Sequence, residues 1–236
     1  MTRADLNIPP LVVFDLDGTL VDTAPDLIGT LDVIFKRHGI PRLAYEDARN
    51  MVGGGARKLI ERGLAAEGCP VPTADLDRLV QEFIAHYAAH IAERSRPFPG
   101  LDAALDQLAA VGCHFAVCTN KLEWLARRLL DALGLSGRFV AICGGDTFGM
   151  QKPHPEVLRR TVVSAGVNGL PIMIGDSITD VSMARAAKTP VIAVSYGYTE
   201  IAPHELGADR VIEALPDLPE AVFDLVRGIA QPEVSP

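Results

Sequence analysis

The chain has 236 residues, of which 48% are apolar and 22% charged, and a formal net charge of −8 at pH 7. This is an ordinary globular composition, and it excludes a disordered or collagen-like chain. The negative charge argues against nucleic acid or an anionic membrane surface as the main partner, because both attract basic patches. We therefore expect no nucleic-acid partner and no membrane partner. A small anionic ligand would need a local group that reverses the field.

The cysteines show no paired spacing of the C-x-x-C kind, which favours reduced, buried thiols. The first ten residues contain Arg3, Asp5 and two prolines in place of an apolar signal core. No apolar run approaches the roughly 20 residues that a membrane-spanning helix needs. A cytoplasmic location is predicted. The cysteines are Cys69, Cys113, Cys118 and Cys143.

Short apolar runs recur along the chain and predict the buried strands of a parallel sheet. Helical patterns lie between them, such as the one formed by Leu122, Leu125, Leu129 and Leu133, which ends at Gly134. This alternation predicts an α/β fold: a Rossmann-like parallel sheet with helices on both faces. The expected strands cover residues 11–14, 114–118, 139–143, 171–174, 191–194 and 210–212.

Nearly a hundred residues separate the first two expected strands, far more than an ordinary crossover requires. Thr23 followed three residues later by Asp26 resembles a capping box at the start of a helix. An apolar stripe at helical spacing covers residues 76–91. The insertion is therefore predicted to be an all-α cap domain. The predicted division is a catalytic core of residues 1–20 and 97–236, with the helical cap at residues 21–96.

Asp15 and Asp17 belong to the motif Asp-Leu-Asp-Gly-Thr, which directly follows the first expected strand. Open α/β sheets bind their ligands at this end of the strands. An accidental match to four fixed positions is about a one-in-a-thousand event in a chain of this size. Carboxylates at i and i+2 can place one side chain and one backbone carbonyl on the same metal ion, while the second carboxylate faces elsewhere.

Three further strand ends carry polar residues, and each of these signals is weak by itself. Thr119 and Asn120 could meet a phosphoryl oxygen, but a helix cap or a turn explains them as well. Lys152 follows the next strand, and a lone loop lysine is usually solvated. Asp176 and Asp180 open a helix, where capping is the simpler explanation. Carboxylates gathered at neighbouring strand ends would repel one another unless a cation joined them.

In chain order, these motifs resemble those of the haloacid dehalogenase superfamily of phosphotransferases, over essentially the whole chain and including the inserted cap. The resemblance implies that Asp15 is the nucleophile that forms an aspartyl-phosphate, and that Asp17 is first the acid and then the base. It also implies that Thr119 and Lys152 bind the transferring phosphoryl group. The Mg²⁺ site that it implies consists of Asp15, Asp17 through its carbonyl, Asp176 and Asp180, with support from Ser177.

Three positions favour a phosphomonoesterase over other members of the superfamily. The dehalogenases lack the second aspartate, which is Asp17 here. Sugar phosphomutases of this cap type usually carry valine or isoleucine in place of Thr19. In the phosphonate-cleaving relatives a cap lysine forms a Schiff base, whereas Lys58 lies beside an arginine in an expected helix start.

Phrases in both halves of the chain, among them residues 51–64 and 118–121, are similar to those of the phosphoglycolate phosphatases. This similarity implies hydrolysis of 2-phosphoglycolate to glycolate and phosphate. Three glycines that include Gly54 lead into Arg57 and Lys58, which could meet the carboxylate of such a substrate, with Asn120 as a further contact. A plain turn with solvated cations explains this loop equally well.

Several alternatives stay open at this point. The substrate could be another small phosphate ester, such as a sugar phosphate, a nucleotide or pyridoxal phosphate, or it could be pyrophosphate. A phosphoacceptor signalling module would also combine strand-end carboxylates, a threonine, a lysine and magnesium, and a non-catalytic binding module could use the same scaffold. The chain could be a monomer or a homodimer, because the apolar stripe of the cap could face the core or a second copy.

Overall fold

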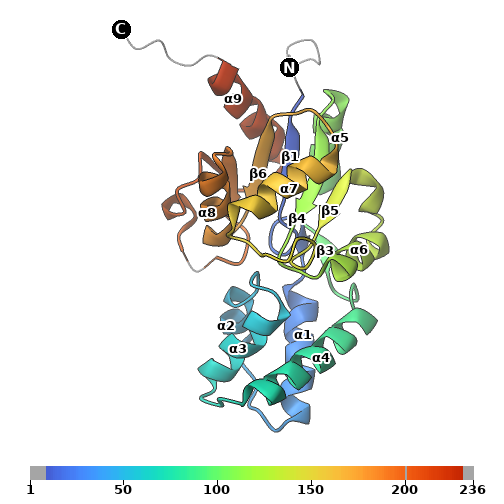
Figure 1. Ribbon diagram of the computed structural model, residues 1–236, viewed down its shortest axis with the longest axis vertical. Coiled ribbons are helices and arrows are strands. Elements are labelled where there is room, and N and C mark those ends of the chain that lie inside the picture. The colour runs from blue at the N-terminus through green and yellow to red at the C-terminus, as the bar shows by residue number, and fades with distance from the viewer. Residues whose placement is uncertain (1–8, 200, 231–236) are drawn as a thin grey trace.

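The computed structural model describes residues 9–199 and 201–230 (Figure 1). Its main sheet has six strands, all parallel, in the order β5-β4-β1-β6-β7-β8, and this confirms the predicted α/β class. The strands are β1 (Leu11–Phe14), β4 (His114–Cys118), β5 (Ala141–Cys143), β6 (Pro171–Gly175), β7 (Val191–Val194) and β8 (Arg210–Ile212).

Strand β1 shows why helices cover both faces of the sheet. Val12 and Phe14 belong to one apolar cluster, whereas Leu11 and Val13 belong to a second. Successive strand side chains point to opposite faces, so both faces of this strand need a cover. The first cluster includes side chains of α5 (Leu101–Ala110), α6 (Glu123–Ala132) and α9 (Leu218–Ala230), and the second those of α7 (Pro155–Ala165) and α8 (Ile178–Ala187).

One expected strand is shorter in the structure. The strand predicted for residues 139–143 begins only at Ala141, because a 3-10 turn over Ser136–Arg138 precedes it. Val140 still donates a backbone hydrogen bond of 2.8 Å to Phe115, but its side chain is exposed. The apolar run therefore includes residues that lead into the strand.

The long insertion forms a group of four helices at the carboxyl end of the sheet (Figure 1). Helix α4 packs against both α1 and α3. The chain leaves and re-enters the core through β2 (Val21–Asp22) and β3 (Arg96–Pro97), which pair antiparallel. The predicted domain limits fall in this ribbon. The helices are α1 (Ala24–Arg37), α2 (Tyr45–Asn50), α3 (Ala56–Ala66) and α4 (Thr73–Ala89).

The predicted capping box at the start of α1 is wrong. The hydroxyl of Thr23 donates to Asp17 at 2.7 Å and makes no side-chain cap to the helix. The Asp26 carboxylate accepts hydrogen bonds from the backbone of Arg94 at 3.0 Å and from the backbone and hydroxyl of Ser95 at 2.7 Å. Tertiary hydrogen-bond partners therefore replace the local ones. The hydrogen bonds of Asp26 with Arg94 and Ser95 join the two segments that connect the cap to the core.

The apolar cluster that contains Phe14 does not stop at the sheet. It continues through Leu16 and Leu20 to Leu27 on α1 and Phe83 on α4. All of these side chains are buried.

Among the helices of the described residues, none combines the length and the hydropathy of a membrane span.

Candidate active site

The strand order brings the predicted motifs together. Strand β1 lies between β4 and β6, so the residues after these three strands share one edge of the sheet. The backbone N–H of Asp15 donates to Ile174 at 2.9 Å, and that of Thr119 donates to Cys143 at 3.1 Å. These hydrogen bonds extend the ladder past the strand ends and fix the backbone from which the polar side chains project.

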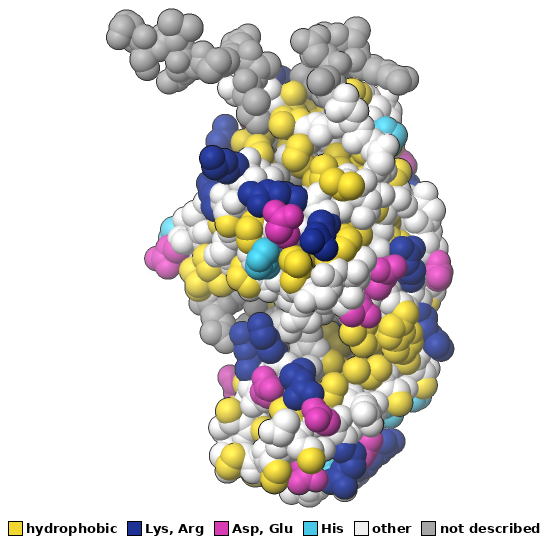
Figure 2. Space-filling view, in the orientation of Figure 1, with side chains coloured by type: hydrophobic (Ala, Val, Ile, Leu, Met, Phe, Trp, Pro, Cys, Tyr) yellow, Lys and Arg dark blue, Asp and Glu magenta, His cyan; other side chains and the backbone are white. Residues whose placement is uncertain are grey.

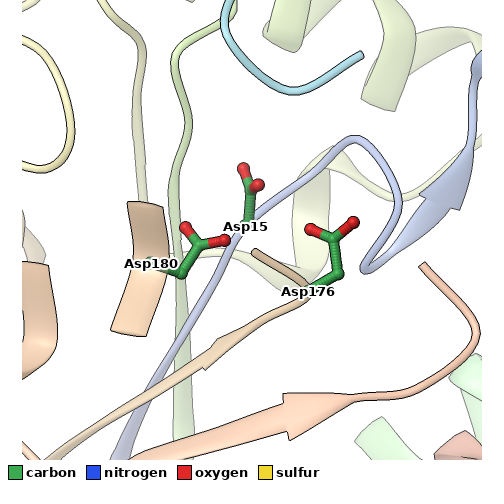
Figure 3. A group of neighbouring side chains, drawn as sticks. All are labelled: Asp15, Asp176 and Asp180. Atoms are coloured by element: carbon green, nitrogen blue, oxygen red, sulfur yellow. The ribbon is translucent and has the colours of Figure 1, made fainter. Parts of the chain in front are cut away.

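Three carboxylates meet at this edge. Asp15, Asp176 and Asp180 each contribute an oxygen, and these oxygens lie within 4.8 Å of one another. Figure 3 shows the three side chains, which come from three different segments, directed toward a common region. All three residues are buried. Oxygen ligands grouped in this way are those that Mg²⁺ prefers, so this donor set fits a divalent cation.

Lys152 lies between two of these carboxylates and is itself buried. Its ammonium is 2.8 Å from Oδ1 of Asp15 and 2.7 Å from Oδ1 of Asp180. Burial opposes the charge of the lysine, but the attraction of the two carboxylates raises the pKa of Lys152. With three carboxylates ionised and one lysine protonated, the cluster has a net charge of −2, which a divalent cation would neutralise.

The excess negative charge changes the proton affinity of the cluster. Burial raises the pKa of Asp15 to about 8; Lys152 opposes this shift, and repulsion from Asp180 and Asp176 adds to it. Burial and repulsion from Asp180 raise the pKa of Asp176 to about 7. Burial and mutual repulsion therefore shift the pKa values of both carboxyls upward, and a bound divalent cation would act in the opposite direction.

The side chain of Asp17 does not belong to this group of three carboxylates. Its oxygens lie 2.8 and 3.1 Å from the ammonium of Lys121, and it also accepts the hydrogen bond from Thr23. Lys121 is buried and stands 4.7 Å from the centre of the Tyr87 ring on α4. Neither Lys121 nor Tyr87 is among the site residues predicted from the sequence. The available signal was a lysine directly after Thr119 and Asn120.

Thr119 and Asn120 take different positions in the site. The hydroxyl of Thr119 accepts the backbone N–H of Lys121 at 3.2 Å. The amide oxygen of Asn120 accepts the backbone N–H of Lys152 at 2.9 Å, and its amide nitrogen donates to the Lys152 carbonyl at 3.4 Å. The Asn120 side chain, predicted to contact substrate, therefore holds the backbone of the buried lysine in this structure.

Asp180 and Ser177 combine capping with support of the site. Oδ2 of Asp180 accepts the hydroxyl of Ser177 at 2.6 Å and its backbone N–H at 3.2 Å, at the start of α8. The other oxygen binds Lys152. The sequence allows either capping or site support at Asp180, and this one carboxylate makes both sets of contacts.

Asp176 is enclosed by residues that leave it little freedom. It accepts the backbone N–H of Tyr198 at 2.7 Å, and the hydroxyl of Thr19 lies 3.3 Å away. A Cβ on Gly18, which has a φ of +84°, would lie 2.4 Å from an Asp176 oxygen, and one on Gly197 would lie 2.2 Å from the Asp176 Cβ. Both glycines are required here because the backbone approaches the carboxylate so closely.

The predicted cap loop is only partly directed toward the site. Arg57 borders the same cavity as Asp17, but its guanidinium pairs with Asp77 on α4. Lys58 packs its stem against Gly54, where an added Cβ would come within 2.8 Å of the Lys58 Cδ. Gly54 and Lys58 do not line that cavity. Their contact with substrate stays a prediction.

A cavity of about 150 Å³ lies beside Asp17, between the cap helices and the core. Figure 2 shows the surface hollowed where these two parts of the molecule meet. Most of the cavity wall is apolar, including Val52, Leu59 and Phe83 from the cap and Leu122 from the core. A ligand in this space would touch both parts of the chain.

Comparison with known proteins identifies the family. The family model described as haloacid dehalogenase-like hydrolase matches residues 12–194. The chain belongs to this family. This confirms the resemblance seen in the sequence, and it covers both the strand-end motifs and the inserted helices.

Relatives with similar sequences extend over almost the full chain. A phosphoglycolate phosphatase of Caulobacter vibrioides is 45% identical over 232 residues, with 98% of each chain covered. A phosphoglycolate phosphatase of Agrobacterium fabrum is 44% identical, with 95% of this chain and 96% of that protein covered. The crystal structure of a predicted phosphoglycolate phosphatase from Haemophilus somnus superimposes with a TM-score of 0.84 at 26% identity, covering 94% of this chain and 99% of that one.

Proposed function

We propose that this hydrolase is a magnesium-dependent phosphomonoesterase that hydrolyses 2-phosphoglycolate through an aspartyl-phosphate on Asp15. The observation that carries the proposal is the meeting of Asp15, Lys152 and Asp176 at one sheet edge, with Asp17 beside them at the mouth of a small cavity. The names of the relatives supply the substrate.

In this proposal the Asp15 carboxylate attacks phosphorus, and the bond from phosphorus to the substrate oxygen breaks. Asp17 gives a proton to the leaving oxygen, which departs as the hydroxyl of glycolate. Asp17 then takes a proton from water, whose oxygen attacks the phosphorus of the aspartyl-phosphate. Inorganic phosphate leaves, and the Asp15 carboxylate is restored.

The surrounding residues have positioning and electrostatic tasks. Lys152 stabilises negative charge on the transferring group and orients Asp15, while Thr119 offers a hydroxyl and a backbone N–H to a phosphoryl oxygen. Asp15, Asp176 and the carbonyl of Asp17 would hold Mg²⁺, with Asp180 as a supporting group. The bound ion would supply positive charge against the phosphoryl oxygens, which is what phosphoryl transfer chiefly needs.

Steady-state turnover of 2-phosphoglycolate tests the proposal. We expect turnover with Mg²⁺, loss of turnover with a chelator, and loss of at least about 10³-fold in the Asp15→Asn variant. Asp106→Asn is the matched control, because this exposed aspartate lies outside the site. A phosphoacceptor module would take up one phosphate per chain and stop, and a binding module would show no turnover.

A panel of phosphate esters tests the substrate. The specificity constant for 2-phosphoglycolate should exceed those for sugar phosphates, nucleotides, pyridoxal phosphate and pyrophosphate. A higher value for any of these would overturn the substrate while leaving the phosphomonoesterase in place. The cytoplasmic location and the choice between monomer and homodimer remain predictions of the sequence.

A further inference from the structure

The cavity beside Asp17 is where the leaving group of the proposed reaction would lie. The acid that protonates a leaving oxygen must be within hydrogen-bond reach of it, so the rest of that group must occupy space next to Asp17. The cavity offers about 150 Å³, which is below the ~300–1,000 Å³ of pockets for drug-sized ligands. Its size suits a leaving group of a few heavy atoms.

Most polar groups that line this cavity already have partners in the protein. Asp17 pairs with Lys121, and Arg57 pairs with Asp77. Asn120 is bound to the backbone of Lys152. A leaving group with many hydroxyls would therefore find few hydrogen-bond partners here.

Two lining side chains, those of Gln151 and Tyr87, have no such partner among the described residues, and of the two only Tyr87 is buried. Its side chain lines the cavity and stacks on Phe83, with ring centres 6.2 Å apart. Its hydroxyl is buried, lies near the ammonium of Lys121 and, among the described residues, has no hydrogen-bond partner within 3.5 Å. An unpaired buried hydroxyl costs free energy, so a native protein rarely keeps one without a use. Burial raises the pKa of Tyr87 to about 12, and the hydroxyl keeps its proton at neutral pH.

Lys121 adds a second donor next to that hydroxyl. Its ammonium lies over the Tyr87 ring and donates hydrogen bonds to the two oxygens of Asp17. A lysine has three N–H donors, and the third can bind a ligand oxygen in place of the nearby Tyr87 oxygen. A hydroxyl donor and an ammonium donor side by side, in a wall that is mostly apolar, favour an anionic group with acceptor oxygens.

We infer that Tyr87 and Lys121 bind the carboxylate of the leaving group and so make the enzyme specific for small phosphorylated acids. This inference rests on the proposed function. It assigns the substrate carboxylate to Tyr87 and Lys121 instead of to the cap loop at Arg57. Tyr87 comes from cap helix α4 and Lys121 from the core, so a substrate carboxylate bound by both would join the two parts of the chain.

The test compares 2-phosphoglycolate with ethyl phosphate, which has a methyl group in place of the carboxylate. In the wild-type enzyme, the ratio of the two specificity constants measures recognition of the carboxylate. Tyr87→Phe keeps the ring stacking and removes only the hydroxyl. We expect this variant to lower the ratio by about 10- to 100-fold, the loss typical of a hydrogen bond to a charged acceptor. KM for 2-phosphoglycolate and the inhibition constant of glycolate should both rise.

Two further variants complete the design. Lys121→Met should also lower the ratio, together with the turnover of both esters, because Asp17 loses its partner. Tyr45→Phe is the matched control: this cap tyrosine is exposed and does not line the cavity, so the ratio should not change. The melting temperature of Tyr87→Phe should equal or exceed that of the wild type, because the hydroxyl that it lacks has no partner to lose.

The outcomes separate this inference from the proposed function. If the wild type prefers 2-phosphoglycolate and Tyr87→Phe keeps the full ratio, the inference is wrong and the proposed substrate stands. If the wild type does not distinguish the two esters, the proposed substrate is wrong and the carboxylate site falls with it. A Tyr87→Phe variant that fails to fold would also overturn the inference, since it would show that the hydroxyl has a structural partner.

Discussion

The ammonium of Lys152 lies 2.7 Å from the carboxylate of Asp180, and this contact joins the loop after β5 to the first turn of α8. The same ammonium binds Asp15. Lys152 therefore stands between two acidic groups that would otherwise repel each other. A buried charge that loses its partners is costly, so the stability of the core depends on this lysine.

Lys152→Met should destabilise the chain by about 3–5 kcal/mol at pH 8, because three buried carboxylates lose their cation. The loss should be smaller at pH 5, where Asp15 and Asp176, with pKa values of about 8 and about 7, are protonated in the folded chain. Urea unfolding at the two pH values measures both effects. Lys36→Met, a change of an exposed lysine on α1, is the control. An equal loss at both pH values would contradict the charge argument.

The metal-free protein should become less stable as the pH rises from 5 to 8. Asp15 and Asp176 bind protons more tightly in the folded chain than at their ordinary pKa of 3.8 in the unfolded chain. Between 3.8 and the raised folded pKa values, only the folded state holds these protons. The free energy of unfolding therefore falls over this range by on the order of 1 kcal/mol per pH unit. Mg²⁺ competes with the protons, so its stabilising effect should grow over the same range. Thermal unfolding with and without Mg²⁺ at each pH measures this effect. A stabilisation by Mg²⁺ that becomes smaller toward pH 8 would contradict the prediction.

Asp26→Ala should cost about 3 kcal/mol, because it leaves the N–H groups of Arg94 and of the buried Ser95 without an acceptor. Although burial acts in the opposite direction, hydrogen bonds from Ser95 and Arg94 lower the pKa of Asp26. Its contribution is present above the unfolded pKa of 3.8 and is lost as the pH falls through the lower folded value. The difference between wild type and variant should therefore become smaller in strong acid. Asp106→Ala, at an exposed ion pair, should change the free energy of unfolding by less than about 1 kcal/mol.

Gly18→Ala should reduce activity more than any other single methyl addition near the motif Asp-Leu-Asp-Gly-Thr. The new Cβ would collide with Asp176 and with the Tyr198 ring, and its φ of +84° costs a further 1–2 kcal/mol or so. We expect lower apparent affinity for Mg²⁺ in activity titrations, together with a lower melting temperature. Gly137→Ala is the matched control, since nothing lies within 4 Å of its added Cβ. Unchanged Mg²⁺ dependence in Gly18→Ala would show that Asp176 tolerates displacement.

The sequence predicted those site residues whose place follows from the strands. Asp15, Thr119 and Asp176 each come directly after an apolar run, and parallel strands bring such ends to one edge. Lys121 and Tyr87 were missed because their contact joins core and cap, which are 34 positions apart in the chain. No local pattern reports a contact of this kind.

Local patterns also misled where tertiary partners were stronger. Thr23 and Asp26 have the spacing of a capping box, yet Asp17 and Ser95 bind their side chains. Arg57 has the position of an anion-binding cation, and it pairs with Asp77 on the neighbouring helix, so its contact with substrate stays a prediction. In each case a short motif fixes which atoms are available, and the packing of distant segments decides what they bind.

The apolar cluster that runs unbroken from Phe14 to Phe83 has a consequence for how the molecule denatures. Because core and cap share one apolar cluster, the unfolding of either part exposes apolar side chains of the other to water. Calorimetry should record a single cooperative endotherm. Deleting the inserted helices would expose Leu16 and Leu20 to water and yield an aggregating fragment instead of a smaller enzyme.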